Sequence, residues 1–465
     1  MKRNLTLTVL LFLCLTSFAG KAPKYVFYFI GDGMGMNQVT STEYFLAHTG
    51  GTKPGYASLA FTQFPYSGMA VTISANSYVT DSSAAGTALA TGFKTNNQML
   101  GMLPDRKTAV ETIAEKAHKK GVRVAIGTTV CIDHATPGAF YGHQPSRDNY
   151  HQIGIQLAES GFEFFGGSDF HTPFQRGIDD EGNYVQAEKA GYYIAHGYDE
   201  YKANRSNGKM ILLDKNPEPD HYLPFAIDRK DDDLTLEEIT TAAIDFMMKD
   251  PKKGFFMMME GGKIDQACHG NDAATAIQEV IDFDNAIKIA IEFYKKHPKE
   301  TLIVITADHE TGAMGLSNGQ YAQNPSVLEN QKASEGELSN ILEQMGKDKG
   351  DILTFEEIEE TFKKYLGFGD KVRLSQKQSD RLRSAYVQAL GMGLDEKKAE
   401  EYYKVDKLTD LAIEIMSEIA QISWGTGSHS GAMVPVFSMG VGAEQFTGIM
   451  DNTDIPKRIE KIAKY

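Results

Sequence analysis

The stretch "KYVFYFIGDGMG" (residues 24–35) decides the fold, because an apolar run from Tyr25 to Ile30 ends abruptly in Gly31 and Asp32. The run is rich in aromatic residues and shows no apolar–polar alternation, which predicts a strand buried on both faces. The glycines around Asp32 allow the backbone to approach an ion closely. We therefore expect a core strand that delivers a carboxylate at its carboxyl end.

Three further apolar runs end in the same way, in polar residues that can do chemistry. They are "VRVAIGTTVCIDHATP" (122–137), leading to His134 and Thr136, "GFFMMMEGGKIDQACH" (254–269), leading to Glu260, Asp265 and His269, and "TLIVITADHETG" (301–312), leading to Asp308 and His309. Helical patterns lie between the runs, for example at 232–249 and 273–296. Strands that alternate with helices predict an α/β fold, here a three-layer sandwich with a mainly parallel central sheet. Ligands of such sheets bind beyond the carboxyl ends of the strands, where all four runs place these residues.

The stretch "SYVTDSSAAGTALATGFKT" (77–95) places two serines behind an aspartate and before a run of small residues. It predicts a helix with Asp81 or Ser82 as its N-cap and a face that packs tightly on a neighbour. A helix N-terminus is also an anion site, so a hydroxyl there could meet a phosphate. The stretch alone favours the packing interpretation.

Composition narrows the class of partner. The 465 residues carry 47 Lys and Arg against 62 Asp and Glu, a net charge of -15, which argues against nucleic acid as a partner. Any phosphate site in so acidic a chain needs local cations, either metal ions or a placed arginine. The segment from about 316 to 420 is charged and amphipathic with a helical period, and we expect a helical insertion standing on the α/β core.

Residues 1–20 read as a secretory signal peptide, with a basic start, an apolar stretch and small residues at its end. The apolar stretch is too short for a stable membrane span, so we expect an exported, periplasmic or extracellular protein. The mature chain would keep Cys131 and Cys268. Nothing in the sequence shows whether these two pair, and we expect both to be small buried residues.

The acidic and imidazole side chains suggest a metal site. Asp265 and His269 are four residues apart, on one face of a helix, and both can reach one ion. Asp308 and His309 follow a strand, and His429 in "WGTGSHSG" (424–431) lies in a small-residue loop that could bring it back. Oxygen and imidazole ligands suit zinc and magnesium.

Taken together, the motifs "GDGMG", "VTDSSAAGTALATGFKT", "HATPGAFYGH" with "SRDNY", "EGGKIDQACH", "TADHETG" and "GSHSG" resemble the alkaline phosphatase family. They occur in the family's order and cover nearly all of residues 21–465 except the insertion. The resemblance implies a zinc- and magnesium-dependent phosphomonoesterase that forms a phosphoserine, releases inorganic phosphate and an alcohol, and has a broad substrate range. It also suggests a homodimer.

The resemblance assigns a role to each motif residue. Ser82 matches the nucleophile, and Ser83 stands where many members have alanine. Arg147 of "SRDNY" matches the phosphate clamp, and Asp81 the carboxylate that orients it. The expected ligands are Asp265, His269 and His429 for one zinc, Asp32, Asp308, His309 and the Ser82 oxygen for the second, and Asp32, Thr136, Glu260 and His134 for a third, magnesium-type site.

Three other interpretations stay open from the sequence. A phosphodiesterase, sulfatase or phosphomutase of the same broad fold is the nearest. A secreted binding protein that keeps the metals without chemistry is the second, although no nucleophile or ligand is missing. A calcium-stabilised structural protein is disfavoured, because calcium does not prefer imidazole ligands.

Overall fold

The computed structural model describes residues 22–50, 59–175, 181–206, 208–218, 221–319, 321–350, 352–389 and 406–465. The expected signal peptide therefore lies outside the described residues. Among the residues that are described, no helix combines the length and the apolar composition needed to span a bilayer.

The strands are β1 (Tyr25–Gly31), β2 (Tyr66–Val71), β3 (Arg123–Thr128), β4 (Phe164–Gly167), β5 (Tyr192–His196), β6 (Lys209–Leu213), β7 (Phe255–Gly261), β8 (Thr301–Thr306), β9 (Glu310–Thr311), β10 (His429–Ser430), β11 (Val434–Gly440) and β12 (Gly448–Asp451).

The helices are α2 (Met36–Thr49), α3 (Ser82–Thr91), α4 (Ile113–Lys119), α5 (Ala135–Gly138), α6 (Tyr150–Ser160), α7 (Gly182–Lys189), α8 (Tyr198–Asn204), α9 (Leu236–Met247), α10 (Lys263–His269), α11 (Ala273–Lys296), α12 (Glu335–Lys349), α13 (Phe355–Leu366), α14 (Gln376–Ala389), α16 (Asp406–Ala420) and α17 (Asp454–Ala463), with 3-10 turns η1 (Phe61–Gln63), η2 (Pro325–Asn330) and η3 (Ala443–Phe446).

Ten strands form one sheet in the order β12-β2-β11-β8-β1-β7-β3-β4-β6-β5. Only β11 runs antiparallel to its neighbours in this sheet, so the mainly parallel α/β fold expected from the sequence is confirmed. The four runs that ended in polar residues are β8, β1, β7 and β3, which are neighbours at the centre. Their residues are buried along the whole length of each strand, as the absence of alternation predicted.

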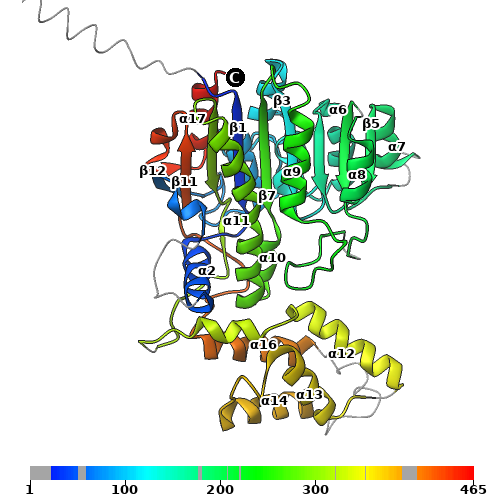
Figure 1. Ribbon diagram of the computed structural model, residues 1–465, viewed down its shortest axis with the longest axis vertical. Coiled ribbons are helices and arrows are strands. Elements are labelled where there is room, and N and C mark those ends of the chain that lie inside the picture. Colours follow the sequence, from blue (N-terminus) through cyan, green and yellow to red (C-terminus); the bar gives the residue numbers. More distant parts are fainter. Residues whose placement is uncertain are drawn as a thin grey trace, which may run out of the picture.

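Helices cover both faces of the sheet. In Figure 1, α9 and α11 lie in front of the strands, and the segments around α3 and α4 lie behind them. Packed aromatic rings hold the front layer to the sheet, for example Phe27 against Phe293 of α11 at 5.5 Å between ring centroids. Since β1 and β7 run downward in this view, their carboxyl ends meet the lower edge, where α2 and α10 begin.

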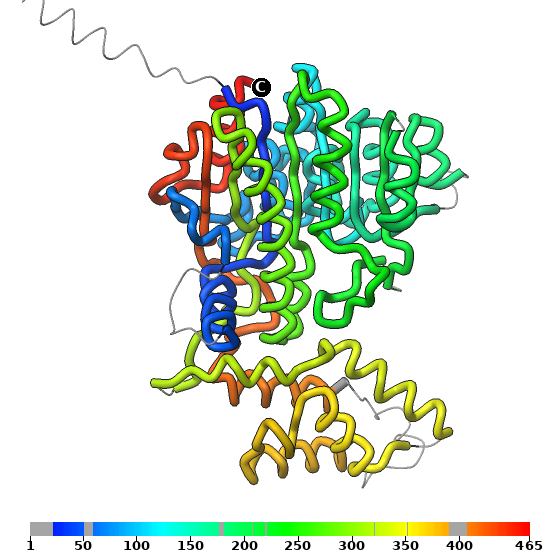
Figure 2. Tube along the Cα trace, in the orientation of Figure 1, coloured from blue at the N-terminus to red at the C-terminus, as the bar shows by residue number. Residues whose placement is uncertain are grey.

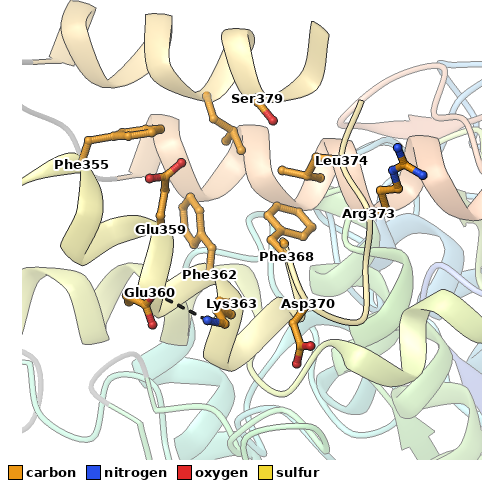
Figure 3. Close-up of a pocket in the computed structure, with 12 residues that line it drawn as sticks. Phe355, Glu359, Glu360, Phe362, Lys363, Phe368, Asp370, Arg373, Leu374 and Ser379 are labelled. Atoms are coloured by element: carbon orange, nitrogen blue, oxygen red, sulfur yellow. Dashed lines mark ion pairs between the residues drawn. The ribbon is translucent and has the colours of Figure 1, made fainter. Parts of the chain in front are cut away.

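The segment expected as a helical insertion contains α12, α13, α14 and α16, and it stands below that lower edge (Figures 1 and 2). Its apolar side chains form a second core cluster, which includes Leu338, Phe362 and Leu408. The cluster also contains Phe45 of α2 and Ile277 of α11, so the insertion packs directly on the α/β core. A cavity between α13 and α14, drawn in Figure 3, is lined by phenylalanine and charged side chains of the insertion alone.

Candidate active site

The carboxyl ends of the four central strands bring the predicted residues together at one edge of the sheet. Gly31 and Gly261 end the adjacent strands β1 and β7, which places Asp32 beside the start of α10. β8 ends at Thr306, just before Asp308 and His309. Parallel neighbours end at the same edge, so residues far apart in the sequence become neighbours in space.

A first cluster consists of Asp32, Asp308 and His309, all fully buried, with ligand atoms within 4.8 Å of one another. His309 Nε2 lies 3.2 Å from Asp308 Oδ2 and 3.5 Å from Asp32 Oδ1. The backbone N–H of Gly33 donates to Asp308 Oδ1 and fixes that carboxylate. Ser82 Oγ lies 3.3 Å from His309 Nε2, at the edge of this cluster.

A second cluster consists of Asp265, His269 and His429. α10 places Asp265 and His269 one turn apart, with His269 Nε2 3.2 Å from Asp265 Oδ2. His429 Nε2 lies 3.2 Å from His269 Nε2 and 3.7 Å from Asp265 Oδ1. The second nitrogen of each imidazole faces a backbone carbonyl, Gly427 O for His269 and Thr80 O for His429. Both Nε2 atoms are therefore turned toward the carboxylate, as in a metal site.

A third cluster shares Asp32 with the first and adds His134 and Glu260. Glu260 accepts a hydrogen bond from the Thr128 hydroxyl, which orients it. Thr136 follows His134 in the short helix α5 and is buried. His134 Nε2 lies 3.2 Å from Arg147 Nη2, so the third cluster adjoins the arginine.

Asp81 organises the start of α3, where the two serines lie. It is the N-cap residue, and it accepts hydrogen bonds from the Ala84 N–H at 3.0 Å and from the Ser83 hydroxyl at 2.6 Å. Arg147 Nη1 lies 3.3 Å from the same carboxylate. Ser82 is left to face His309, so the two adjacent hydroxyls have different partners.

Buried polar atoms without hydrogen bonds test whether the three clusters fit cations. Both carboxylate oxygens of Asp32, one oxygen each of Asp308 and Glu260, the Thr136 hydroxyl and His134 Nδ1 are buried and make no hydrogen bond. Burying carboxylates without donors is unfavourable unless a cation compensates them. Oxygen and imidazole donors in groups of three or more match zinc and magnesium, so the residues fit such ions.

Burial and mutual repulsion of the carboxylates shift their acidity. Burial, together with the charges of Asp308 and Asp265, raises the pKa of Asp32 well above its ordinary value. Burial likewise raises the pKa of Asp308 to about 8 and that of Glu260 to about 7. Three carboxylates that resist ionisation together mark a place where positive charge is needed.

In the second cluster the pKa of the carboxylate is lowered instead of raised, because imidazoles surround it. Burial opposes ionisation of Asp265, but the hydrogen bond from His269 and the imidazole charges lower its pKa below the ordinary range. The same hydrogen bond raises the pKa of His269 to about 9. The pair stabilises itself by charge, whereas burial and mutual repulsion dominate the carboxylates of the first and third clusters.

Three residues that support the site did not stand out in the sequence. Thr311 donates from its hydroxyl to Asp265 and lies 3.3 Å from His309 Nδ1, so it touches both clusters. Gln38 donates to the buried Glu310. Thr311 also pairs with His429 across the two-stranded β9–β10 sheet, which brings the distant loop back. The position of "ET" directly after "ADH" was the available signal.

The two cysteines are both buried free thiols, as expected of small core residues, and they do not pair. The side chain of Cys268 lies 3.8 Å from Gln38 Nε2. Neither cysteine belongs to a cluster of potential metal ligands among the described residues.

Comparisons with known proteins agree with the fold and with the motifs. The model of the family described as "Alkaline phosphatase" matches residues 23–167 and 217–465. The chain is 32% identical to Alkaline phosphatase 4 of Bacillus subtilis over 454 residues, which cover 95% of this chain and 89% of that one.

Solved structures of alkaline phosphatases are also similar to this chain. The cold-active alkaline phosphatase of the psychrophile Shewanella sp. is similar at a TM-score of 0.77 with 27% identity, covering 94% of this chain and 99% of that one. A mutant alkaline phosphatase of the Antarctic bacterium TAB5, solved with Mg bound, is similar at a TM-score of 0.66 with 26% identity, covering 96% and 99% of the two chains.

Proposed function

The chain belongs to the alkaline phosphatase family and is a phosphatase of that family, and from this premise we propose that it hydrolyses phosphate monoesters through a phosphoserine formed on Ser82. The observation that carries the proposal is the position of Ser82 Oγ, 3.3 Å from His309 Nε2 beside the buried Asp32 and Asp308. A hydroxyl at a helix N-terminus among potential metal ligands is poised as a nucleophile.

The proposed metal assignment rests on the family resemblance and is supported by the three clusters. Two zinc ions would be held by Asp265, His269 and His429, and by Asp32, Asp308, His309 and Ser82. A magnesium ion would be held by Asp32, His134, Thr136 and Glu260. When bound, such ions supply Lewis acidity, which lowers the pKa of a hydroxyl and neutralises charge on the entering and leaving oxygens.

The residues of the chain then perform two displacements. Ser82 Oγ bonds to phosphorus while the ester P–O bond breaks, and the proton that the Ser82 hydroxyl gives up balances the one that the released alcohol takes. Water next bonds to phosphorus and loses a proton, the Ser82 Oγ–P bond breaks, the Ser82 hydroxyl is restored by one proton, and inorganic phosphate leaves. Arg147, oriented by Asp81, offers its guanidinium to the nonbridging oxygens, and the first amides of α3 point to the same charge.

The acidic chain needs these local cations because its overall charge repels an anionic substrate. We propose no nucleic acid as a binding partner and a broad range of small phosphate monoesters. We also propose that the protein is exported to the periplasm or the extracellular space and that it forms a homodimer. We propose one catalytic domain over residues 21–465, with a helical insertion at about 316–420.

One experiment tests the reaction class. Purified protein is assayed on a nitrophenyl monoester, a nitrophenyl diester and a nitrophenyl sulfate, before and after chelation, with metal analysis of the same sample. We expect monoester hydrolysis to dominate, to vanish with the metals and to return with zinc and magnesium. Dominant diester or sulfate hydrolysis would assign the chain another reaction, and metals without hydrolysis would indicate a binding protein.

A further inference from the structure

Glu310 is a buried carboxylate that stands between two residues of the site. It lies between His309 and Thr311 in β9, and only 5% of the residue is exposed. Among the described residues it belongs to no cluster of potential metal ligands. A buried carboxylate that binds no cation needs hydrogen-bond donors, so its partners indicate what it does.

Four donors from three segments surround this carboxylate. Oε1 of Glu310 accepts from Gln38 Nε2 of α2 at 2.8 Å and from the Met314 N–H at 3.2 Å. Oε2 accepts from the Ala313 N–H at 3.1 Å and from the Ser430 hydroxyl of β10. Both oxygens are used, and the carboxylate joins α2, the turn after β9 and β10.

The turn after β9 has a backbone that needs support. Gly312 and Ala313 have φ angles of +89° and +46°, so two successive residues are left-handed. This conformation is unfavourable for a residue that has a Cβ atom, such as Ala313. Because Glu310 accepts from the N–H groups of Ala313 and Met314, it stabilises the turn.

The turn in turn holds residues 425–430, called the His429 loop below. The Gly312 N–H donates to Ser428 O at 2.9 Å, and Gly312 O accepts from the Gly425 N–H at 3.0 Å. Glu310 therefore holds the loop on both sides of His429. It acts through the turn on the preceding side and through the serine that follows His429 on the other.

The His429 loop shapes most of the second cluster. It carries His429 itself, and Gly427 O lies 2.8 Å from His269 Nδ1, which orients the other imidazole. Asp265 completes the cluster, with one oxygen 3.7 Å from His429 Nε2. Groups that orient metal ligands contribute to metal affinity, so the position of the loop should decide how well this cluster binds an ion.

On its opposite side, Glu310 is fixed against the start of α2. A Cβ atom at Gly35, the N-cap residue of α2, would clash with Glu310 Cγ. Gln38, one turn further on, also donates to Thr311 O at 2.8 Å. In Figure 1, α2 stands at the lower edge of the sheet, where α10 also begins. The last glycine of "GDGMG" thus lets α2 pack directly on the carboxylate.

We propose that Glu310 is a positioning residue, which holds the His429 loop and so sets the zinc affinity of the cluster of Asp265, His269 and His429. The proposal rests on the proposed function and adds the way in which the chain assembles one of its metal sites. In this role Glu310 touches neither the ion nor the substrate.

The variant Glu310→Gln tests the proposal. An amide of the same size offers one oxygen and an NH₂ group, so it cannot accept from all four donors. We expect the zinc affinity of the second cluster to fall by about tenfold to a hundredfold. Zinc content is measured at a series of free zinc concentrations set by a chelator, with magnesium in excess to fill the third cluster.

The His429→Ala background assigns the effect to the loop. The zinc that remains in His429→Ala belongs to the first cluster, and adding Glu310→Gln should change its affinity by no more than about twofold, since the coupled ligand is gone. Ser430→Ala is a milder variant, which removes a single donor to Glu310. It should weaken zinc binding by the second cluster by about threefold to tenfold.

A matched control is Glu43→Gln, which changes another buried carboxylate of α2. Glu43 accepts from the Thr62 hydroxyl at 2.5 Å and from the Leu59 N–H at 3.3 Å, and it belongs to none of the three clusters. This variant should lower Tm and keep the wild-type zinc affinity. The comparison separates a loss of stability from a loss of metal binding.

Wild-type zinc affinity in a folded Glu310→Gln protein would overturn the positioning proposal alone. If that variant does not fold, unchanged zinc affinity in Ser430→Ala would overturn it. An equal loss from the first cluster in the His429→Ala background would also overturn it. A wild-type protein that binds no zinc would instead refute the proposed function, so the two failures are distinguishable.

Discussion

The two adjacent serines illustrate how different neighbours give identical side chains different roles. Ser82 faces His309, whereas Ser83 donates to Asp81, which in turn holds Arg147. Ser83 therefore supports the carboxylate beside Arg147, and no hydrogen bond among the described residues joins its side chain to His309. The resemblance alone proposed Ser82 as the nucleophile, and its position beside His309 supports that proposal.

Replacing Ser82 by alanine should reduce kcat by at least about a thousandfold, because the nucleophile of a covalent mechanism is lost. Ser83→Ala should keep kcat within about threefold and cost about 1 kcal/mol of stability, the value of one hydrogen bond. Phosphoenzyme trapped at acid pH and detected by mass spectrometry checks both. Phosphoserine persisting in Ser82→Ala would move the nucleophile elsewhere.

Arg147→Ala should leave measurable activity and weaken kcat/KM by about tenfold to a thousandfold, because the proposed metal ions would carry much of the charge neutralisation. Arg147→Lys should recover only part of the loss, since a lysine cannot present the planar two-pronged fork. Steady-state kinetics with inorganic phosphate as inhibitor measure both effects. Complete inactivity in a folded, metal-loaded Arg147→Ala protein would contradict this division of roles.

At the scale of elements, the small residues of α3 let that helix pack closely on α5. A Cβ atom at Gly86 would lie 3.1 Å from Ala139 Cβ and 3.3 Å from Thr136 Cα. Because α3 carries Ser82 and α5 carries Thr136, the distance between these helices sets the distance between the proposed nucleophile and the third cluster. The run of alanine and glycine after Ser82 thus has a structural purpose that serves the site.

Gly86→Val should force the two helices apart, which would destabilise the protein by about 1–3 kcal/mol and lower kcat. Gly336→Ala in α12 is the matched control, since nothing lies within 4 Å of a Cβ there. That change should be neutral or stabilising by up to about 1 kcal/mol. Denaturant melts and kcat of both variants check the prediction, which an active, fully stable Gly86→Val protein would refute.

At the scale of the whole molecule, the buried carboxylates make the metal-free fold sensitive to pH. The pKa of Glu260 is raised to about 7 and that of Asp308 to about 8, against ordinary values of 4.5 and 3.8. Between the ordinary and the raised values, the folded chain binds protons that the unfolded chain has released. The stability of the metal-free protein therefore falls as pH rises through this window.

Removing the metals should lower Tm, and the loss should be larger at pH 8.5 than at pH 6, because bound cations replace the missing protons. Thermal melts with and without chelator, at the two pH values and constant ionic strength, measure this. Restoring zinc and magnesium should recover Tm at both. An equal loss at the two pH values would show that the carboxylates do not carry the effect.

Some features could be predicted because they are local to the chain. An apolar run without alternation must be buried on both faces, so the four central strands, the parallel sheet and the edge that carries the site followed from the sequence. The one-turn spacing of Asp265 and His269 likewise predicted a shared face on a helix, which α10 provides.

Other features depend on contacts between distant segments, which no local pattern encodes. Pairing of His429 with Thr311 closes the second cluster, and a cavity lined by residues of α16 and of the end of α10 lies beside it. The amino-acid sequence by itself determined which residues reach the sheet edge, because burial and helical spacing are properties of a single segment. Only the tertiary structure decided which of them touch and what surrounds the candidate site, because those relations arise when separate segments pack together.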